Sequence, residues 1–224
     1  MNVKDLGLTL NDTQLNQFEM YYNFLIAENK KYNLTAITDE KEVYFKHFYD
    51  SLTLVKTNLI KEGISLCDIG SGAGFPSIPI KILFPSIKVT IIESQTKKTQ
   101  FLKQLINHLK LDNVDIINTR AEDYAHTAYF DIVTARAVAH LSILNELCMP
   151  FVKKGGYFIA MKGSYQEELE HSKNGIKILG GKLENVISFE LPHQMGERHL
   201  ILIKKEKMVK GYPRPFAQIK KNPL

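Results

Sequence analysis

Apolar residues follow a helical spacing in the first quarter of the chain and form short separate blocks after it. Two early segments repeat apolar side chains every three or four residues, which is the pattern of an amphipathic helix. Asn11 can cap the first of them, because Gln14 follows three residues later as in a capping box. The pattern therefore predicts a turn at residues 32–36 between two helices, over residues 11–30 and 40–60.

From residue 64 onward, short apolar runs alternate with amphipathic stretches. The runs predict strands over residues 64–69, 89–93, 114–117, 130–135, 157–161, 183–191 and 200–204. The stretches predict helices over residues 76–84, 96–109, 141–149 and 165–179. Repeated strand-helix-strand units of this kind predict a parallel sheet covered by helices on both faces. The last two strands have no helix between them, so they must pair as a hairpin and add one antiparallel strand to a seven-stranded sheet.

A glycine cluster follows the first of these strands and opens the next helix. Glycines there permit a tight turn and let the backbone approach a ligand. A dinucleotide-binding loop has its third glycine five residues after the first, but Phe75 occupies that position. The spacing Gly-x-Gly-x-Gly, with an acid two residues upstream, resembles the S-adenosylmethionine loop of class I methyltransferases, which have a Rossmann-like fold. This resemblance implies cofactor contacts at Asp68, Gly70, Ser71, Gly72, Gly74 and Phe75.

Two further acids stand at the ends of predicted strands. Glu93 ends the second strand, where an acid can accept hydrogen bonds from both ribose hydroxyls of a nucleoside cofactor. Glu122 lies just beyond the third strand, and in class I methyltransferases the residues at that strand end face the adenine. Each acid alone is as well explained as a solvated loop carboxylate, but the glycine loop at the matching spacing favours the cofactor role.

The composition excludes several classes of protein. Of the 224 residues, 44% are hydrophobic, which is enough for a folded core. The longest apolar runs are far too short to cross a membrane. The first five residues lack the pattern of a signal peptide, so we expect a cytoplasmic protein. Cys67 and Cys148 stand in no metal-binding pattern and are predicted to be buried apolar residues, so no metal is expected.

The net charge of +5 lies in one place. Residues 204–224 contain seven Lys or Arg and one acid, whereas the other residues carry 22 basic and 23 acidic side chains. A neutral body with a basic tail is typical of a protein that holds phosphate backbones, although a tail that only aids solubility fits equally well. Because of its prolines, we expect the tail to be extended. The chain is predicted to have three parts: a helical extension (1–60), an α/β core (61–205) and a basic tail (206–224).

Three kinds of methyl-transfer chemistry lack their motifs. After the fourth strand there is no Asn/Asp-Pro-Pro-aromatic motif of amino-directed enzymes, no Pro-Cys dipeptide supplies a thiolate, and no Cys/His cluster could bind a metal. What remains is transfer to an atom that is already nucleophilic, such as guanine N7, which needs positioning rather than a general base. Arg136, at the end of the fourth strand, could hold the guanine edge, the cofactor or a phosphate, and it could also be a surface ion-pair arginine.

Several ordered motifs cover nearly the whole chain: Asn33-Leu34-Thr35-Ala36, Lys46-His47-Phe48-Tyr49-Asp50-Ser51-Leu52, residues 68–79, Arg120-Ala121-Glu122, Thr134-Ala135-Arg136-Ala137-Val138, Met161-Lys162-Gly163, Gly211-Tyr212-Pro213-Arg214-Pro215 and Lys220-Lys221-Asn222-Pro223-Leu224. Together they resemble the bacterial ribosomal RNA small subunit methyltransferase G family, also called glucose-inhibited division protein B. The resemblance implies N7-methylation of one guanine in 16S ribosomal RNA, near the decoding site. It implies cofactor contacts at Gly70, Phe75, Ala121, Glu122 and Arg136.

One position departs from the family, which usually has glycine where this chain has Ser77; we expect little consequence, because serine starts a helix well. The substrate is expected to be 16S ribosomal RNA or the small ribosomal subunit, and no obligatory protein partner is evident. Candidate RNA contacts are the basic residues Lys97, Lys98, Arg136, Lys162, Arg198, Arg214, Lys220 and Lys221.

Two other functions stay open from the sequence. A small-molecule methyltransferase of the same fold would favour an apolar acceptor pocket and no basic tail. An RNA-binding or assembly protein could keep the glycine loop without activity. A hydrolase is disfavoured, because His47, Asp50 and Ser51 lie within one turn of one helix and no nucleophile elbow is present. We expect these three side chains to serve in capping, in packing and in covering the site.

Overall fold

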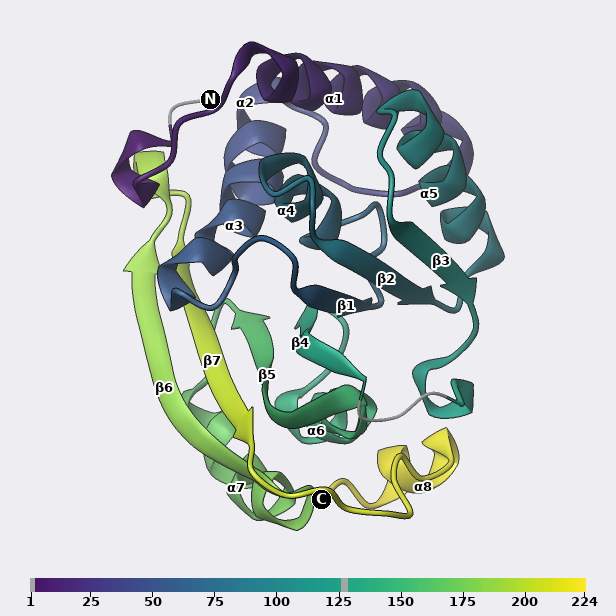
Figure 1. Ribbon diagram of the computed structural model, residues 1–224, viewed down its shortest axis with the longest axis vertical. Helices are drawn as coiled ribbons and strands as arrows, with labels where there is room; N and C mark the ends of the chain where they lie inside the picture. The colour runs from purple at the N-terminus through teal and green to yellow at the C-terminus, as the bar shows by residue number, and fades with distance from the viewer. Residues whose placement is uncertain (1–2, 126–128) are drawn as a thin grey trace.

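A seven-stranded sheet runs through the middle of the computed structural model, which describes residues 3–125 and 129–224 (Figure 1). Its strands are β1 (Ser65–Ile69), β2 (Lys88–Glu93), β3 (Val114–Asn118), β4 (Phe130–Arg136), β5 (Val152–Lys162), β6 (Gly181–Glu190) and β7 (Glu197–Lys205). They lie in the order β3-β2-β1-β4-β5-β7-β6. Only β7 is antiparallel to its neighbours, which confirms the predicted mostly parallel sheet closed by a hairpin.

Helices cover both faces of the sheet. They are α1 (Asp12–Tyr32), α2 (Glu40–Val43), α3 (Asp50–Leu52), α4 (Ser77–Leu83), α5 (Thr96–His108), α6 (Leu141–Cys148), α7 (Gln166–Ile178) and α8 (Phe216–Lys221). Among the described residues, no helix is long and apolar enough to cross a membrane. The predicted α/β class is therefore confirmed, with helices where the amphipathic stretches placed them.

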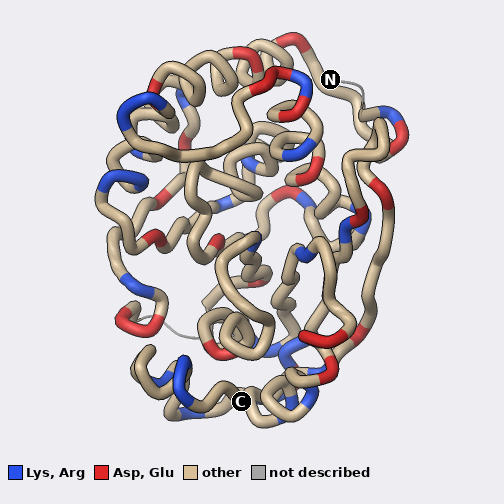
Figure 2. Tube along the Cα trace, turned by 180° about the vertical axis from the view of Figure 1, so that it is seen from behind, with Lys and Arg blue, Asp and Glu red and all other residues tan. Residues whose placement is uncertain are grey.

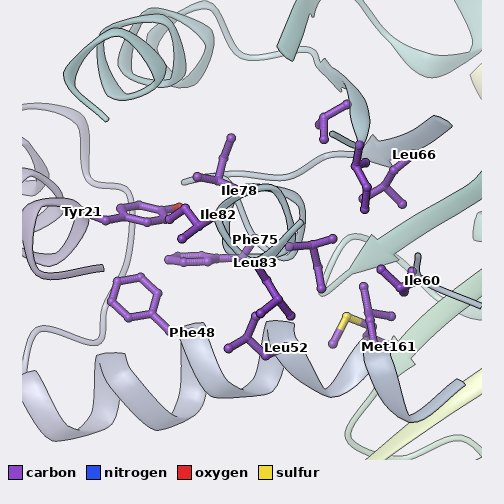
Figure 3. Packing of buried hydrophobic residues seen from close by; sticks show 14 of the residues in the cluster. Tyr21, Phe48, Leu52, Ile60, Leu66, Phe75, Ile78, Ile82, Leu83 and Met161 are labelled. Carbon is purple, nitrogen blue, oxygen red and sulfur yellow. The ribbon is translucent and has the colours of Figure 1, made fainter. Parts of the chain in front are cut away.

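Successive strand residues enter two different cores, because side chains alternate across a sheet. Leu66 packs with α1, α3, α4 and α5, whereas its neighbour Cys67 packs with α6, α7 and α8. Cys67 and Cys148 are both fully buried, as predicted. Figure 3 shows the first core, where Tyr21 and Phe48 lie against Phe75 of the glycine loop. The N-terminal helices are thus packed directly beneath the segment that the sequence assigns to the cofactor.

Helix α1 is held to the sheet layer by polar as well as apolar contacts. Its predicted capping box is present, since Asn11 accepts from the Gln14 N–H and Gln14 accepts from the Asn11 N–H. The same Gln14 side chain donates to the Ile82 and Leu83 carbonyls at 3.1 Å. These carbonyls end α4, so the bond satisfies groups that a helix terminus leaves without partners. The division into an extension and a core stays a prediction.

The second predicted helix is continuous from 40 to 57 but not uniform. Between α2 and α3 the backbone widens into a π-helical segment, Tyr44–Tyr49. π-helical turns inside α-helices are uncommon and are frequently found at functional sites. This one contains His47 and ends directly before Asp50.

Two local expectations were wrong. The fifth strand was predicted to begin at residue 157, but β5 begins at Val152, and residues 155 and 156 lie inside it at a register shift against β4. The tail was predicted to be extended, but it contains the short helix α8, because Pro213 and Pro215 precede the helix rather than interrupt it. The expectation that the first five residues are not a signal peptide falls partly on Met1 and Asn2, which lie outside the described residues.

Candidate active site

The glycine loop turns sharply at the carboxyl end of β1. Gly70, Gly72 and Gly74 have φ of 72°, 62° and 103°, a region that side chains with a Cβ rarely adopt. The Gly70 N–H donates to the Ile92 carbonyl at 2.8 Å and the Gly72 N–H to Glu93 Oε2 at 3.2 Å. The loop is therefore fixed to the end of β2, the neighbouring strand, at the edge where α/β sheets bind ligands.

The glycines serve different purposes. A Cβ on Gly74 would lie 2.6 Å from Tyr21 Oη and 2.8 Å from Ile78, so this glycine is required by close packing. A Cβ on Gly72 would meet nothing within 4 Å. The backbone at Gly72 thus faces open space, as a segment that approaches a ligand must.

Two buried polar groups of the loop have unused bonding capacity. Asp68 is fully buried and accepts a hydrogen bond from the Ser77 N–H at 3.2 Å, but its Oδ1 has no partner. Ser71 Oγ is likewise buried without a partner. Burial raises the pKa of Asp68 to about 7, against the opposing effect of the Ser77 hydrogen bond. Atoms of this kind beside an open backbone fit a polar ligand that completes their bonding.

A pocket of about 160 Å³ continues from the loop along the carboxyl ends of β2, β3 and β4. Ile92, Ala121 and Val138 supply apolar surface, and Glu122 also lines the pocket. Glu93 is 4% exposed and is bound on both oxygens, by the Gly72 and Gln95 N–H groups. A carboxylate has about four acceptor positions, so Glu93 can brace the loop and still accept from ribose hydroxyls.

A second pocket, of about 410 Å³, lies between β4, β5, β7 and the π-helical segment. It is basic, because four cationic side chains from four different elements line it: Lys46, Arg136, Lys162 and Arg198. One buried carboxylate, that of Asp50, stands among them. We call this the basic pocket. Ala137, whose φ of 55° is rare for a non-glycine residue, lines the basic pocket. The next residue, Val138, lines the pocket of about 160 Å³, which we call the adenine-side pocket after the base that the resemblance places there.

Arg136 is the centre of the basic pocket. Its Nη1 donates to Asp50 Oδ2 at 2.7 Å and to the Lys46 carbonyl at 3.1 Å. Arg198 Nε lies 3.3 Å from the other oxygen of Asp50, in an orientation that makes no hydrogen bond. Lys162 is held by Glu168 at 2.6 Å and by the Ala139 carbonyl at 2.8 Å. The arginines are therefore positioned by Asp50 before any substrate arrives.

Phe75 and His47 connect the basic pocket to the glycine loop. The His47 ring stacks on Phe75 with centroids 4.6 Å apart, and the Arg136 guanidinium lies 5.0 Å from the Phe75 centroid. Burial, and next the charge of Arg136, lower the pKa of His47 from 6.5 to about 3. The imidazole is thus neutral at physiological pH and is a weak base. Phe75 itself is 5% exposed, so its side chain serves packing while its backbone lies at the loop.

The candidate RNA contacts fall into three groups. Arg136, Lys162 and Arg198 meet in the basic pocket. Lys97 and Lys98 stand in the first turn of α5, after β2. Lys220 and Lys221 are exposed on α8, where Figure 2 shows basic residues near the end of the chain. Arg214 is separate from these, because it is paired with the fully buried Glu146.

The sequence did not predict every contact of the site. Lys46, His47 and Asp50, from the π-helical segment and α3, were not predicted to share a pocket with Arg136, although His47 and Asp50 were expected to help cover the site. Phe216 of the tail was not predicted to line the pocket beside the glycine loop. The motif at residues 46–52 was a usable signal for the first three. Their pairing with Arg136 was not visible, because 86 residues separate Asp50 from Arg136. Among the described residues, no group of three or more His, Cys, Asp or Glu is arranged to hold a metal ion.

The sheet order, the glycine loop, the acid at the end of β2 and the open pocket beside them define a class I S-adenosylmethionine-dependent methyltransferase. Residues 14–201 match the family model described as rRNA small subunit methyltransferase G. The chain belongs to this family.

Relatives and solved structures agree with this assignment. The chain is 54% identical to the ribosomal RNA small subunit methyltransferase G of Staphylococcus saprophyticus, over 97% of this chain and 93% of that protein. The protein of the same name in Staphylococcus carnosus is 51% identical, over 99% and 95%. A class I methyltransferase structure from Listeria monocytogenes has a TM-score of 0.62 at 12% identity, over 89% and 71%. TYW2 of M. jannaschii, in complex with AdoMet, has a TM-score of 0.55 at 20% identity, over 69% and 74%. These two structures support the fold.

Proposed function

We propose that the chain methylates N7 of one guanine in 16S ribosomal RNA, near the decoding site, with S-adenosylmethionine as methyl donor. The observation that carries the proposal is the basic pocket beside the glycine loop. Several cationic side chains line it, but it offers little that could act as a general base. A ribosomal substrate places the reaction in the cytoplasm.

The cofactor would be held by the residues that the sequence selected. The open backbone at Gly72 and the unpartnered atoms of Asp68 and Ser71 fit its polar part. Glu93 would accept from the ribose, and the pocket formed by Ile92 and Ala121 would take the adenine. When bound, the cofactor supplies an electrophilic methyl group. The protein's contribution is to orient both reactants and to exclude water.

The basic pocket suits a guanine and its phosphates. Guanine N7 carries a lone pair and no proton, so methyl transfer to it needs no general base. The groups present agree with that need, since His47 has a pKa of about 3 and Asp50 is bound to Arg136. Lys46, Lys162 and the two arginines would neutralise phosphates on either side of the base.

The two alternatives are less well supported. A small-molecule methyltransferase would have an apolar acceptor pocket, whereas four cations line this one. A protein that had lost activity would not be expected to keep the glycine loop braced by Glu93 and the arginines positioned by Asp50.

The test is methyl transfer from labelled S-adenosylmethionine to RNA and to 30S subunits from a strain that lacks this gene. Nuclease digestion and mass spectrometry should identify 7-methylguanosine at one position of 16S RNA. The matched variant Arg136→Lys keeps the charge but loses the planar guanidinium that donates to both Asp50 and the Lys46 carbonyl, so it should reduce transfer by at least tenfold while still binding S-adenosylhomocysteine. A different methylated nucleoside, or transfer only to small molecules, would overturn the proposal.

A further inference from the structure

The tail is docked on the body of the protein by an ion pair with a buried carboxylate. Arg214 donates to Glu146 from its Nε at 2.7 Å, from its Nη2 at 2.6 Å and from its backbone N–H at 2.9 Å. Glu146 is fully buried in α6, and Ile219 of the tail is fully buried in the same core. This anchoring places α8 beside the carboxyl edge of the sheet rather than in solvent (Figure 1).

The docked tail delivers one aromatic side chain to the adenine-side pocket. Phe216, the first residue of α8, lines this pocket together with Ile92, Ala121 and Val138. The guanidinium of Arg120, from the end of β3, lies 5.6 Å from the centroid of the Phe216 ring. Phe216 is half-buried, so part of the ring stays available to a ligand. An aromatic ring in such a wall offers a face or an edge to a purine.

We propose that Phe216 is part of the cofactor site, where it contacts the adenine, and that cofactor binding and docking of α8 stabilise each other. This inference rests on the proposed placement of the adenine between Ile92 and Ala121. The coupling is reciprocal by thermodynamic necessity: whatever holds α8 in place raises cofactor affinity, and bound cofactor holds α8 in place.

This role differs from that of an RNA-binding arm. In such an arm the basic side chains would be free for phosphate, but Arg214 is committed to Glu146. The exposed Lys220 and Lys221 lie on the same short helix as Phe216, so RNA bound there would contact the element that closes the cofactor pocket.

The chain contains no tryptophan, which allows a direct test. Phe216→Trp introduces a single tryptophan into the pocket wall, and its emission can be excited selectively beside the ten tyrosines of the chain. Its emission should change in intensity or wavelength on titration with S-adenosylhomocysteine and with adenosine alone. Tyr129→Trp is the matched control, because Tyr129 is 67% exposed at the opposite end of β4 and its emission should stay constant.

The affinity for S-adenosylhomocysteine and the protection of the tail from hydrogen exchange provide the second readout. Phe216→Ala should raise the Kd of S-adenosylhomocysteine by roughly 5- to 150-fold, the range found when a base loses an aromatic partner. Adenosine should lose affinity by a similar factor, and Phe216→Tyr should restore most of it. In the wild-type protein, hydrogen exchange in residues 212–221 should slow when S-adenosylhomocysteine binds.

The outcomes distinguish a failure of this inference from a failure of the cofactor-site assignment on which it rests. If the wild-type protein bound no S-adenosylhomocysteine, the cofactor site itself would be misplaced. If it bound normally but the Phe216→Trp emission did not respond and Phe216→Ala kept full affinity, the inference about the tail would be wrong. The inference would also be overturned if Phe216→Ala lost folding stability by as much free energy as it lost in ligand binding, and if Phe216→Tyr restored neither. The loss of affinity would then follow from a general loss of structure.

Discussion

Gly72 is the residue at which the cofactor and a side chain would compete for the same space. A Cβ there points into a region with no protein atom within 4 Å. Gly72→Asp should therefore abolish measurable binding of S-adenosylhomocysteine, because it places a carboxylate where the ligand must pass close to the backbone. The measurement is isothermal titration.

Gly63→Asp is the matched control. Gly63 also has positive φ, at 79°, and open space around its Cβ, but it precedes β1 at a surface turn. Both variants carry similar backbone strain, so a similar loss of stability is expected in each. If Gly72→Asp bound ligand as tightly as Gly63→Asp, the glycine loop would not be the binding segment.

His47 links the site to the pH dependence of stability. Burial, and next the charge of Arg136, lower its pKa to about 3, while the unfolded chain takes up this proton near 6.5. The unfolded state therefore binds more protons than the folded state between these values. The contribution of His47 to the free energy of unfolding is present above pH 6.5 and is lost as the pH falls toward 3.

The prediction concerns the difference in the free energy of unfolding between the His47→Asn variant and the wild-type protein. Below pH 6.5 the free energy of unfolding of the variant, relative to wild type, should rise by up to about 1.4 kcal/mol per pH unit. Urea denaturation at several pH values between 7.5 and 5 measures it. His171→Asn, at an exposed position of α7, should show no such trend. A constant difference across this range would show that His47 titrates normally.

At the scale of elements, Arg214 is what fixes the tail. Removing its side chain leaves the Glu146 carboxylate buried without its main partner. Arg214→Ala should therefore lower the free energy of unfolding by about 2–4 kcal/mol, somewhat less than for a fully buried pair because Arg214 is 24% exposed. Thermal and urea denaturation measure the loss.

The double variant Arg214→Ala/Glu146→Gln should recover part of that stability, because the buried charge is gone. Lys221→Ala, on the exposed side of α8, should change stability by less than about 0.5 kcal/mol. A loss in Arg214→Ala no larger than that in Lys221→Ala would mean that the tail is not anchored by this pair.

Elements with a regular period were predictable from the sequence, whereas irregular ones were not. The strands and the main helices follow from apolar spacing, and the glycine loop and the acid at the end of β2 from their spacing in the chain. The π-helical segment has no such signal, because its apolar residues fit an ordinary helix equally well. Helix α8 is too short to show a period, and its adjacent prolines suggested an extended chain.

The basic pocket was only partly predictable from the sequence, because tertiary packing brings some of its residues together. Arg136, Lys162 and Arg198 were candidates because of their charge, and Arg136 also because of its place at the end of the fourth strand. Lys46 and Asp50 were not, since only the tertiary packing of the second helix brings them to Arg136. The RNA contact of Arg214 stays a prediction, but its pairing with Glu146 could not be predicted, because a sequence shows charge and not the buried carboxylate that a cation meets.

At the scale of the whole molecule, the salt dependence of RNA binding should show which cations contact phosphate. If Lys46 and Arg198 both do so, Lys46→Ala/Arg198→Ala should reduce the slope of log K against log salt by about 1.4–1.8. Lys220→Ala/Lys221→Ala tests the tail in the same way. Lys173→Ala/Lys177→Ala, on α7, is the control and should leave the slope unchanged.

The acids around the basic pocket have a consequence for the kinetics of RNA capture. Its four cations face three carboxylates, since Glu42 pairs with Lys46, Glu168 with Lys162, and Asp50 lies between the two arginines. The electrostatic potentials of opposite charges this close together cancel each other far from the pocket. The potential of the remaining net charge is screened beyond about 8 Å at physiological ionic strength. The pocket therefore exerts little long-range steering. Added salt should slow association only slightly and should instead shorten the lifetime of the complex, in which RNA phosphates have displaced the acids.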